Sequence, residues 1–250
     1  RMRYVDINDA ACRALGYGRE ELLAMGPADV FSMPGSDLAE SYKRLAFGDQ
    51  AASSVEGFYR RKDGSTFPVE AVRRVVASAA GDIIVAIARD ITERRSAEER
   101  FAYLAQFDAL TGLPNRVSFK RRLVEELERS RREDVMLAVC FLDLDHFSRI
   151  NDTLGHRLGD RLVQEVGSRV RDCCRSAEPG AVVARLGGDE FTVILPDLRD
   201  PEVAARLART LLNSFHTPFA LDGHEVFVSA SIGIAIYPTD GPDLESLLKN

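Results

Sequence analysis

Residues 135–145 read Val-Met-Leu-Ala-Val-Cys-Phe-Leu-Asp-Leu-Asp, and residues 185–191 read Arg-Leu-Gly-Gly-Asp-Glu-Phe. The apolar run in the first stretch predicts a strand buried on both faces, and this strand ends directly in Asp143 and Asp145. The second stretch places two further acids in the turn of a predicted hairpin. Carboxylates beside a hydrophobic core are costly unless they are paired or coordinated. Two acid pairs without a cluster of His or Cys therefore favour an all-oxygen site for a hard cation such as Mg²⁺, and with it nucleotide phosphoryl chemistry.

Spacing alone leaves a simpler interpretation open. One of Asp143 and Asp145 would cap the following helix while the other is solvated, and Asp189 and Glu190 would form an ordinary solvated turn. The two glycines before Asp189 have no side chains, so they would let the backbone approach a bulky anion.

Around these two stretches the chain alternates between helical and strand-like patterns. Apolar residues recur at helical spacing over 119–127 and 158–170. The other predicted elements are a helix over 201–215 and strands over 182–186, 191–195, 219–221, 225–230 and 232–236. The resulting order α, β, α, β, β, α, β, β fits a single sheet with helices on its faces.

Length and charge restrict the class of protein. The 250 residues allow two domains, and the 45% hydrophobic content is ordinary for a globular chain. Residues 1–100 carry 15 basic and 16 acidic residues, which leaves 18 basic and 23 acidic residues for 101–250. A domain this acidic is a poor nonspecific binder of nucleic acid. The apolar runs are also far shorter than the roughly 20 residues of a membrane helix, so we expect no membrane segment in this chain.

The cysteines and the first residue bear on location. Cys12, Cys140, Cys173 and Cys174 form no CxxC pair, which favours a reducing, cytoplasmic protein without disulfides. Because the chain begins with Arg1 rather than an initiator Met, we expect it to be a piece of a longer protein. The sequence does not decide whether a membrane anchor precedes Arg1.

The first 91 residues predict a small α+β domain with an antiparallel sheet. Its clearest element is a hairpin formed by 57–59 and 66–72 around the turn residues Asp63 and Gly64. Four segments resemble, in this order, the landmarks of a PAS sensor domain: Tyr4-Val5-Asp6-Ile7-Asn8-Asp9-Ala10-Ala11, Leu15-Gly16-Tyr17 with Glu20-Glu21-Leu22, Arg61-Lys62-Asp63-Gly64-Ser65, and Asp90-Ile91-Thr92-Glu93-Arg94. The resemblance implies a PAS-like domain over 1–91 whose first strand would precede Arg1.

The ligand of this PAS-like domain is restricted but not identified. No His occurs before His146, which argues against a His-ligated haem, and no Cys lies in the asparagine-rich motif of a flavin photosensor. An apolar small molecule, a haem bound through Met or Cys12, or no ligand at all stay open.

Residues 92–107 predict a helix that connects the two domains, because they are rich in charge and lack Gly and Pro. Ala97, Phe101, Leu104 and Asp108 follow one another at spacings of four, three and four residues. This seam is compatible with a parallel dimer coil or with an ordinary linker helix, since a coiled coil needs three or four heptads.

Residues 108–250 resemble the GGDEF family, the diguanylate cyclases. Arg185-Leu186-Gly187-Gly188-Asp189-Glu190-Phe191 carries the signature of that family. Further blocks stand in the family's order: Asp108-Ala109-Leu110-Thr111-Gly112-Leu113-Pro114-Asn115-Arg116, Phe141-Leu142-Asp143-Leu144-Asp145-His146-Phe147, Ile150-Asn151-Asp152-Thr153-Leu154-Gly155-His156, Gly159-Asp160 and Ser231-Ile232-Gly233-Ile234-Ala235. The resemblance implies a ferredoxin-like fold similar to class III nucleotide cyclases and polymerase palms.

The activity implied by this resemblance is the condensation of two GTP molecules into cyclic di-GMP with release of pyrophosphate. The side chains of Asp143 and Asp189, with the Leu144 carbonyl, would hold Mg²⁺ or Mn²⁺. Either Asp189 or Glu190 would accept the proton of the attacking 3′-hydroxyl.

The same resemblance assigns substrate contacts. The backbone N–H groups of His146 and Phe147 would bind phosphates, and Gly187 and Gly188 would let the substrate approach the turn. Asn151 and Asp160 match the guanine-reading residues, and a carboxylate suits this role because it accepts from the N–H edge of guanine. Asp160 could equally stabilise the start of its helix, and His156 is compatible with substrate contact or a structural role.

Two features depart from the family pattern. The family's inhibitory product site is an Arg-x-x-Asp that ends five residues before the Gly-Gly, and here Glu178 and Ala181 occupy those positions. We therefore expect no product inhibition through that site. The chain also ends at Asn250, where the family continues into a helix with Lys and Arg phosphate contacts, so we expect weaker GTP binding from this chain alone.

Three functional interpretations follow. The first is a sensor-regulated cyclase that acts as a homodimer, because one domain holds one GTP and two must meet. The second is a catalytically silent GTP-binding module that regulates a downstream EAL phosphodiesterase domain; residues 215–219 and 237–241 are similar to GGDEF domains of such tandems. The third is a PAS dimerisation and protein-interaction module.

Overall fold

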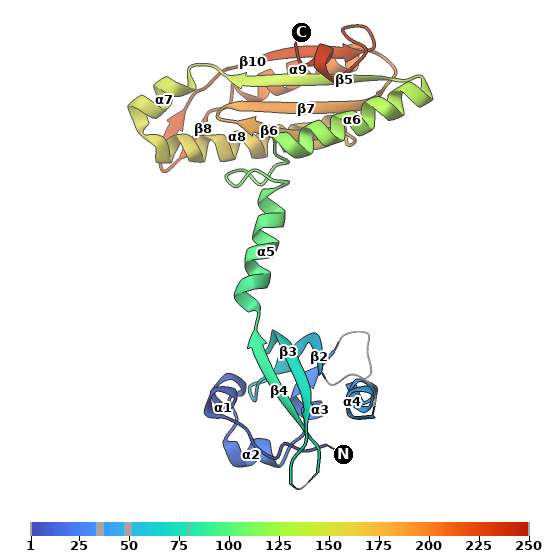
Figure 1. The fold of residues 1–250 in the computed structure, drawn as a ribbon. Helices are drawn as coiled ribbons and strands as arrows, with labels where there is room; N and C mark the ends of the chain where they lie inside the picture. Colours follow the sequence, from blue (N-terminus) through green and yellow to red (C-terminus); the bar gives the residue numbers. More distant parts are fainter. Residues whose placement is uncertain (1, 34–37, 48–51, 80, 250) are drawn as a thin grey trace. The chain divides into compact units, whose positions relative to one another are not determined.

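The computed structural model describes residues 2–33, 38–47, 52–79 and 81–249 of the chain (Figure 1). The chain divides into two compact units, unit 1 over Arg1–Arg100 and unit 2 over Phe101–Asn250. Each unit has its own hydrophobic core, and each is described by itself below.

Unit 1 is a four-stranded antiparallel sheet in the order β1-β2-β3-β4, accompanied by short helices. Asp63 closes the predicted hairpin, because its Oδ1 accepts from the Ser65 N–H at 2.8 Å and from the Ser65 hydroxyl at 2.7 Å. The elements are α1 (Asp9–Leu15), α2 (Arg19–Leu23), α3 (Pro27–Val30), β1 (Phe31–Ser32), α4 (Leu38–Phe47), β2 (Ala52–Arg60), β3 (Thr66–Val76) and β4 (Ile83–Asp90).

The helix α5 (Thr92–Leu104) begins where Asp90 accepts from the Thr92 N–H and hydroxyl, and it buries none of its residues. It ends at Leu104, so Asp108, whose charge interrupts the apolar seam, lies beyond the helix. The end of α5 is joined to the next helix: Asn115 Nδ2 donates to the Leu104 carbonyl at 3.1 Å, and the Ser118 hydroxyl donates to the Gln106 carbonyl at 2.7 Å.

Unit 2 is built on an antiparallel sheet in the order β10-β5-β7-β6. Its strands are β5 (Met136–Leu144), β6 (Val182–Gly187), β7 (Glu190–Leu198) and β10 (Ala230–Tyr237). Its helices are α6 (Arg116–Glu133), α7 (Phe147–Leu154), α8 (His156–Ala177), α9 (Glu202–Ser214) and α10 (Leu244–Leu247).

The prediction of a single sheet in this unit is wrong in one respect. The strands β8 (Phe219–Leu221) and β9 (His224–Val226) pair only with each other, as a separate two-stranded sheet. Asp222 and Gly223 both take positive φ, 48° and 85°, and close a tight turn. The apolar side chains of this hairpin join the core beside α8, so it packs on a helix instead of extending the sheet.

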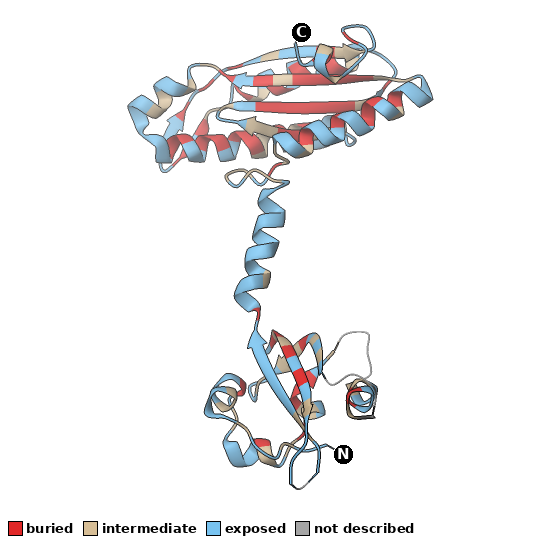
Figure 2. Cartoon of the chain, in the orientation of Figure 1, coloured by how far each residue is buried: buried red, intermediate tan, exposed pale blue. Residues whose placement is uncertain are grey.

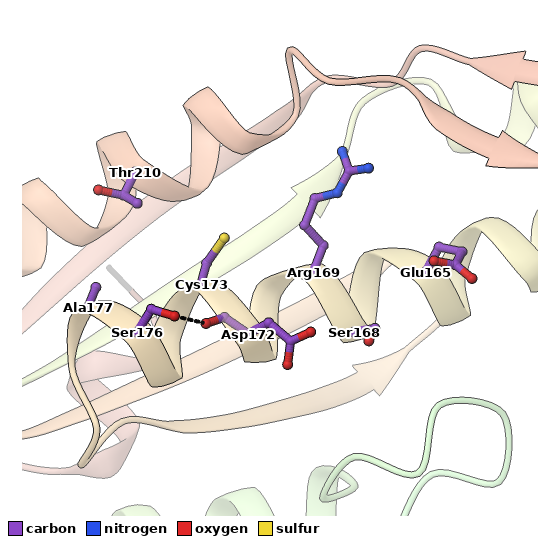
Figure 3. Close-up of a pocket in the computed structure, with 8 residues that line it drawn as sticks. All are labelled: Glu165, Ser168, Arg169, Asp172, Cys173, Ser176, Ala177 and Thr210. Carbon is purple, nitrogen blue, oxygen red and sulfur yellow. Dashed lines mark hydrogen bonds between the residues drawn. The ribbon is translucent and has the colours of Figure 1, made fainter.

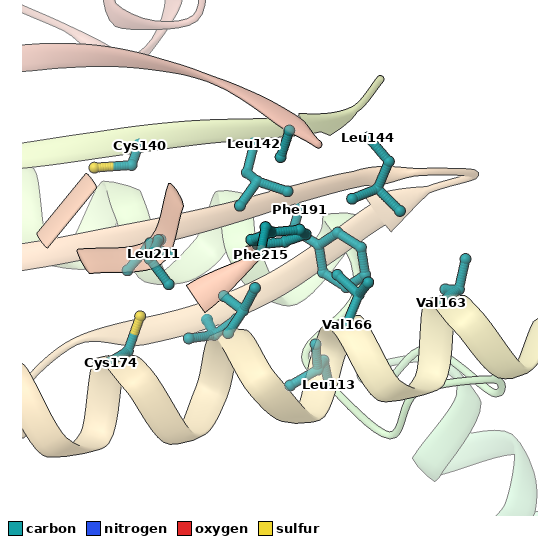
Figure 4. Close-up of a cluster of buried hydrophobic side chains, with 14 of the residues drawn as sticks. Leu113, Cys140, Leu142, Leu144, Val163, Val166, Cys174, Phe191, Leu211 and Phe215 are labelled. Carbon is teal, nitrogen blue, oxygen red and sulfur yellow. The ribbon is translucent and has the colours of Figure 1, made fainter. Parts of the chain in front are cut away.

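The central strand β5 has a hydrophobic core on each face. Leu137 and Val139 pack with α6. Cys140 and Leu142 pack with α8 and α9 (Figure 4), and most of β5 is buried (Figure 2). Burial raises the pKa of the Cys140 thiol to about 12, which makes it an inert apolar side chain at neutral pH. Successive residues of a strand point to opposite faces, which explains why Leu137 and Val139 pack on one face of β5 and Cys140 and Leu142 on the other.

The mixed α+β fold class is confirmed: an antiparallel sheet domain with short helices, then a helix, and then a domain with helices around an antiparallel sheet. All four cysteines are free thiols. Among the described residues, no helix combines the length and the apolar character needed to cross a membrane.

Candidate active site

The turn between β6 and β7 exposes bare backbone. Gly187 has φ 140° and Gly188 has φ 52°, conformations that L side chains rarely adopt. No atom lies within 4 Å of the position that a β-carbon would take on either glycine. The backbone on this side of the turn is therefore open to a large anionic group.

Asp143 lies between two neighbouring strands. It pairs with Glu190 of β7 on one side and with Ser231 of β10 on the other. Burial raises the pKa of Asp143, and the negative charges of Asp189, Glu190 and Asp145 raise it further. The structure therefore brings Asp143, Asp189 and Glu190 together in a region of negative potential.

Asp145 has a different environment from Asp143. Its carboxylate accepts from the Ser229 hydroxyl at 2.6 Å and from the Ser231 hydroxyl at 2.7 Å, and these bonds lower its pKa. It therefore fastens β10 to the end of β5. It does not cap α7, whose N-cap residue is His146 without a side-chain cap. The simpler interpretation, in which one of these acids caps the next helix, is wrong.

His146 turns the chain from β5 into α7. Its φ of 59° lies in the left-handed region, and Phe147 is the first residue of the helix. The N–H groups at the start of a helix have no intrahelical acceptor and attract anions. The N–H groups of His146 and Phe147, which the sequence predicts to bind phosphate, thus lie at the start of a helix, a position that suits this role.

The predicted guanine readers lie on α7 and α8. The side chain of Asn151 packs directly against Gly159, the residue before Asp160. Asp160 and His156 are both exposed and are one helical turn apart on α8. Because Asp160 is the fifth residue of α8, it lies beyond the first turn that would be stabilised by an acid. Within the described ranges, no hydrogen bond or ion pair joins this group to the carboxylates at the end of β5.

Arg116 is a site residue to which the sequence assigned no role. It begins α6, where Asn115 caps the helix by accepting from the N–H groups of Val117 and Ser118. Its Nη2 lies 3.3 Å from Glu190 Oε2, and its Nε donates to the Leu186 carbonyl at 3.3 Å. The cap signal at Asn115 could have located Arg116 at a helix start, but not its contact with Glu190, which is distant in the sequence.

A cavity of about 480 Å³ lies beside this pair. Its charged and polar lining residues are Arg116, Lys120, Asp143, Glu190 and Ser231, from α6, β5, β7 and β10. The two cations on α6 therefore line the same cavity as Asp143 and Glu190, and this space is large enough for a phosphate-bearing group.

Arg185 holds the Gly187-Gly188 turn through hydrogen bonds from its side chain. Its Nη2 and Nε donate to the Gly188 carbonyl at 2.7 and 3.1 Å, and its Nη1 donates to Asp108 Oδ1 at 2.7 Å. Partial burial raises the pKa of Asp108, but hydrogen bonds from Thr111 and Arg185 outweigh it, so the pKa lies below its usual value. The side chain of Arg185 is only 10% exposed, and a charged residue between the apolar residues of β6 was the signal for this role.

The donor set fits a hard divalent cation bound together with a phosphate. Asp143 makes no ion pair among the described residues, and its pKa is raised first by partial burial and then by the negative charges of the neighbouring acids. In the part of the chain that the structure describes, no group of three or more His, Cys, Asp or Glu side chains could hold a metal by itself. Mg²⁺ typically takes only one or two carboxylates and completes its shell with substrate phosphates and water, so two carboxylates suffice.

A second groove lies between α8 and α9 and has a volume of about 670 Å³ (Figure 3). None of the predicted site residues lines it. Arg169 crosses this region and donates to the carbonyls of Ser214, Thr217 and Pro218, with its guanidinium over the Phe219 ring at 3.5 Å. Arg169 therefore has a structural role in this groove, because its hydrogen bonds hold the end of α9 in place. Glu178 and Ala181, at the positions of the family's product site, form the turn after α8.

Comparison with known proteins identifies the class to which this fold and site belong. Residues 105–250 match the family described as "Diguanylate cyclase, GGDEF domain", and residues 2–93 match the family described as "PAS domain". The chain belongs to the GGDEF family, and a PAS domain precedes its GGDEF domain.

Several known proteins are similar to this chain in sequence. An "Uncharacterized signaling protein" of Caulobacter vibrioides is 38% identical over 86% of this chain and 28% of its own length. The "Cyclic di-GMP phosphodiesterase NbdA" of Pseudomonas aeruginosa is 47% identical over 59% of this chain and 18% of its own length. The "Diguanylate cyclase TpbB" of the same species is 41% identical over 59% of this chain and 33% of its own length. The chain thus spans a third or less of each of these relatives.

Solved structures agree with the family. The GGDEF domain of TpbB from Pseudomonas aeruginosa has a TM-score of 0.55 and 41% identity, and the match covers 57% of this chain and 82% of that chain. The coiled coil and GGDEF domain of DgcB from Caulobacter crescentus, solved in complex with c-di-GMP, has a TM-score of 0.54 and 25% identity, over 64% of this chain and 83% of that chain.

Proposed function

We propose that this chain is the sensor and catalytic part of a diguanylate cyclase, which condenses two GTP molecules into cyclic di-GMP with release of pyrophosphate. The observation that carries the proposal is the placement of Asp143 opposite Glu190, beside an open Gly187-Gly188 turn, with Arg116 and Lys120 across the cavity. Anionic ligands for a cation, open backbone and facing cations are what a triphosphate substrate requires. The family match and the name of the relative TpbB support the same activity.

The site residues have separate roles in the proposed reaction. Asp143, Asp189 and the Leu144 carbonyl hold Mg²⁺ or Mn²⁺. When bound, this ion neutralises phosphate charge and lowers the pKa of the attacking 3′-hydroxyl. Asp189 or Glu190 accepts the proton of that hydroxyl, while Arg116 restrains Glu190. The 3′-oxygen then bonds to the α-phosphorus of the second GTP, and pyrophosphate leaves.

Substrate recognition uses the other end of the site. The N–H groups of His146 and Phe147 bind phosphates, and Gly187 and Gly188 allow close approach. Asn151 and Asp160 read the guanine edge, and His156 lies within one turn of Asp160 on the same helix face. Adenine lacks the donor pair that Asp160 would accept, so the proposal includes selectivity for GTP over ATP.

Two copies are required in this proposal. One GGDEF domain supplies one GTP, and each 3′-hydroxyl must reach the α-phosphate held by the other copy. The active species is therefore a homodimer with its sites face to face, in which the PAS domain controls how the two meet.

A second function has a specific observation in its favour. The relative NbdA, at 47% identity, is named a phosphodiesterase of cyclic di-GMP, and this chain spans only 18% of it. The alternative is therefore a silent GTP-binding domain that regulates a downstream EAL phosphodiesterase domain.

One experiment separates the two functions. Pyrophosphate release from GTP with Mg²⁺ is measured on the full-length protein at increasing protein concentration, for wild type, Asp189→Ala and the surface control Asp172→Ala. The cyclase proposal expects a rate per protein that rises with concentration, is unchanged in Asp172→Ala and is lost in Asp189→Ala. GTP binding without turnover in the wild type would refute it in favour of the regulatory module.

A further inference from the structure

Three hydrogen bonds join Asp145 to a distant segment of the chain, residues 229–231. Its Oδ2 accepts from the Ser229 hydroxyl at 2.6 Å, and its Oδ1 accepts from the Ser231 hydroxyl at 2.7 Å. The Asp145 N–H donates to the Ser229 carbonyl at 2.9 Å. Because a carboxylate accepts at both of its oxygens, it can take a hydroxyl hydrogen from each serine at the same time. Asp145 is therefore held through its side chain and through its backbone.

The backbone bond sets the direction of the Leu144 carbonyl. This carbonyl and the Asp145 N–H belong to one planar trans peptide, so they point in opposite directions. The strands β10 and β7 flank β5 on its two sides. Since the N–H points to Ser229, directly before β10, the Leu144 carbonyl points toward β7. The residue before the first residue of β7 is Asp189. The bond from Asp145 to Ser229 thus aims the Leu144 carbonyl at the side of the sheet that carries Asp189.

Asp145 is also the last residue before the turn into α7. His146 has φ 59°, and Phe147 begins the helix. A residue other than glycine takes this left-handed conformation at a cost, and it keeps the conformation only where the surroundings hold the backbone. The anchored Asp145 is the fixed point from which this turn leaves the sheet. It lies between the carbonyl proposed to hold the cation and the two N–H groups proposed to bind phosphate.

We propose that Asp145 is a positioning residue of the cyclase reaction. It acts through its two neighbours: it holds the Leu144 carbonyl toward the cation, and it holds the N–H groups of His146 and Phe147 toward the phosphates. The inference rests on the proposed function, which assigns the cation and the phosphates to these groups. Residues that orient a metal ligand from outside the coordination shell typically change metal affinity about ten- to hundredfold when they are removed.

The test measures how much Mg²⁺ strengthens the binding of guanosine α,β-methylene triphosphate. In this analogue a carbon replaces the oxygen between the α- and β-phosphorus, so pyrophosphate cannot leave. The full-length protein is titrated by calorimetry with Mg²⁺ and with EDTA, and the ratio of the two affinities is compared between variants. We expect Asp145→Ala to lower this ratio at least about tenfold.

The conservative variant Asp145→Asn separates hydrogen bonding from charge. Its side-chain oxygen still accepts from one serine hydroxyl, and its amide donates to the other serine oxygen. Asp145→Asn should therefore recover most of the ratio that Asp145→Ala loses. An equal loss in both variants would assign the effect to the negative charge and overturn the proposal.

The structural control is Asp243→Ala. Asp243 makes a similar contact away from the site, because its Oδ1 accepts from the Ser246 N–H at 2.9 Å and from the Ser246 hydroxyl at 2.8 Å at the start of α10. Its loss should lower the unfolding temperature and leave the ratio of affinities unchanged. A ratio that is unchanged in Asp145→Ala, or that falls equally in Asp243→Ala, overturns the positioning role.

Ser229→Ala covers the case in which Asp145→Ala does not fold. It removes one hydroxyl donor and keeps the backbone bond to Asp145, so the ratio should fall by a smaller factor, about threefold. An unchanged ratio in Ser229→Ala contradicts the proposal.

Failure of this inference is distinguishable from failure of the cyclase proposal, because the analogue is not turned over. A wild type that gains affinity from Mg²⁺ but releases no pyrophosphate from GTP refutes the cyclase alone, since the ratios still decide the role of Asp145. A wild type that gains no affinity from Mg²⁺ overturns the inference.

Discussion

The amide oxygen of Asn151 fills the space in which a β-carbon on Gly159 would lie. That β-carbon position is 1.8 Å from Asn151 Oδ1 and 2.9 Å from its Cγ. Gly159 thus allows α7 to seat Asn151 against α8, directly beside Asp160. The glycine holds two predicted guanine readers next to each other.

Gly159→Ala should therefore weaken GTP binding without unfolding the chain. Ala favours a helix over Gly by about 1 kcal/mol, which offsets part of the clash, but the amide of Asn151 must move. Loss of one guanine hydrogen bond is about 1.4 kcal/mol, so we expect the Kd for GTP to rise about tenfold. Calorimetric titration of GTP in an Asp189→Ala background, which prevents turnover, measures it.

The control for this prediction is a double-mutant cycle. If Gly159→Ala acts by moving Asn151, it should add little in an Asn151→Ala background. Equal loss of affinity in both backgrounds would show that the alanine acts through α8 instead.

Asp108→Asn should destabilise unit 2 at neutral pH, because Arg185 keeps a nearly buried charge without its ionic partner. We expect a loss of about 1–3 kcal/mol in the free energy of unfolding. Since the pKa of Asp108 is lower in the folded chain, its stabilisation is complete above the unfolded value of about 3.9 and disappears as the pH falls through the folded value. Denaturant unfolding from pH 7 to 3 checks this: the difference from the wild type should shrink only below about pH 4. Asp172→Asn, in an exposed ion pair with Arg175, is the control that should change little.

Asp143→Asn should stabilise the metal-free chain while it removes stabilisation by Mg²⁺. A carboxyl whose pKa is raised by folding lowers stability as the pH rises through that pKa. Because Asp143 is exposed, the gain should be no more than about 1 kcal/mol at pH 7 and should vanish below about pH 4. Thermal unfolding with EDTA and then with Mg²⁺ and GTP reads both effects. A variant that is less stable than the wild type in EDTA at pH 7 would contradict the negative potential.

Arg116→Ala should lower turnover far more than stability. Its contact with Glu190 joins two side chains that are 57% and 52% exposed, so the ion pair contributes under about 1 kcal/mol to folding. Release of Glu190, together with loss of a cation that lines the cavity, should reduce kcat/KM for GTP at least about tenfold. Steady-state pyrophosphate release measures both constants. Arg121→Ala, on the same helix next to Glu125, should behave as wild type; a matching loss there would assign the effect to the helix charge instead.

Local patterns in the sequence predicted most of the elements. The apolar run of β5, the Gly-Gly turn and the helical spacing of α8 each depend on neighbouring residues, and each lies where it was expected. The two strands of the β8–β9 hairpin were predicted, but their separation from the main sheet was not, because it depends on how Phe219 and Leu221 pack against α8.

The candidate site was predictable only in part. Asp143, Asp189 and Glu190 follow from the strand ends, and their proximity follows from the antiparallel register. Arg116, 74 residues from Glu190, and Arg185, 77 residues from Asp108, make contacts that no local pattern contains. The contrast between Asp143 and Asp145 likewise depends on two distant serines, Ser229 just before β10 and Ser231 within it.

Hydrogen bonds connect the end of α5 to the residues that follow it in unit 2. Asn115 donates to the last carbonyl of α5, Arg185 donates its backbone N–H to the adjacent Pro114 carbonyl at 2.9 Å, and its guanidinium holds the Gly188 carbonyl. Three hydrogen bonds and a short length of covalent backbone thus connect Leu104 to the turn that carries Asp189. The end of α5 and the turn that carries Asp189 are therefore joined by a continuous route of hydrogen bonds and backbone within unit 2.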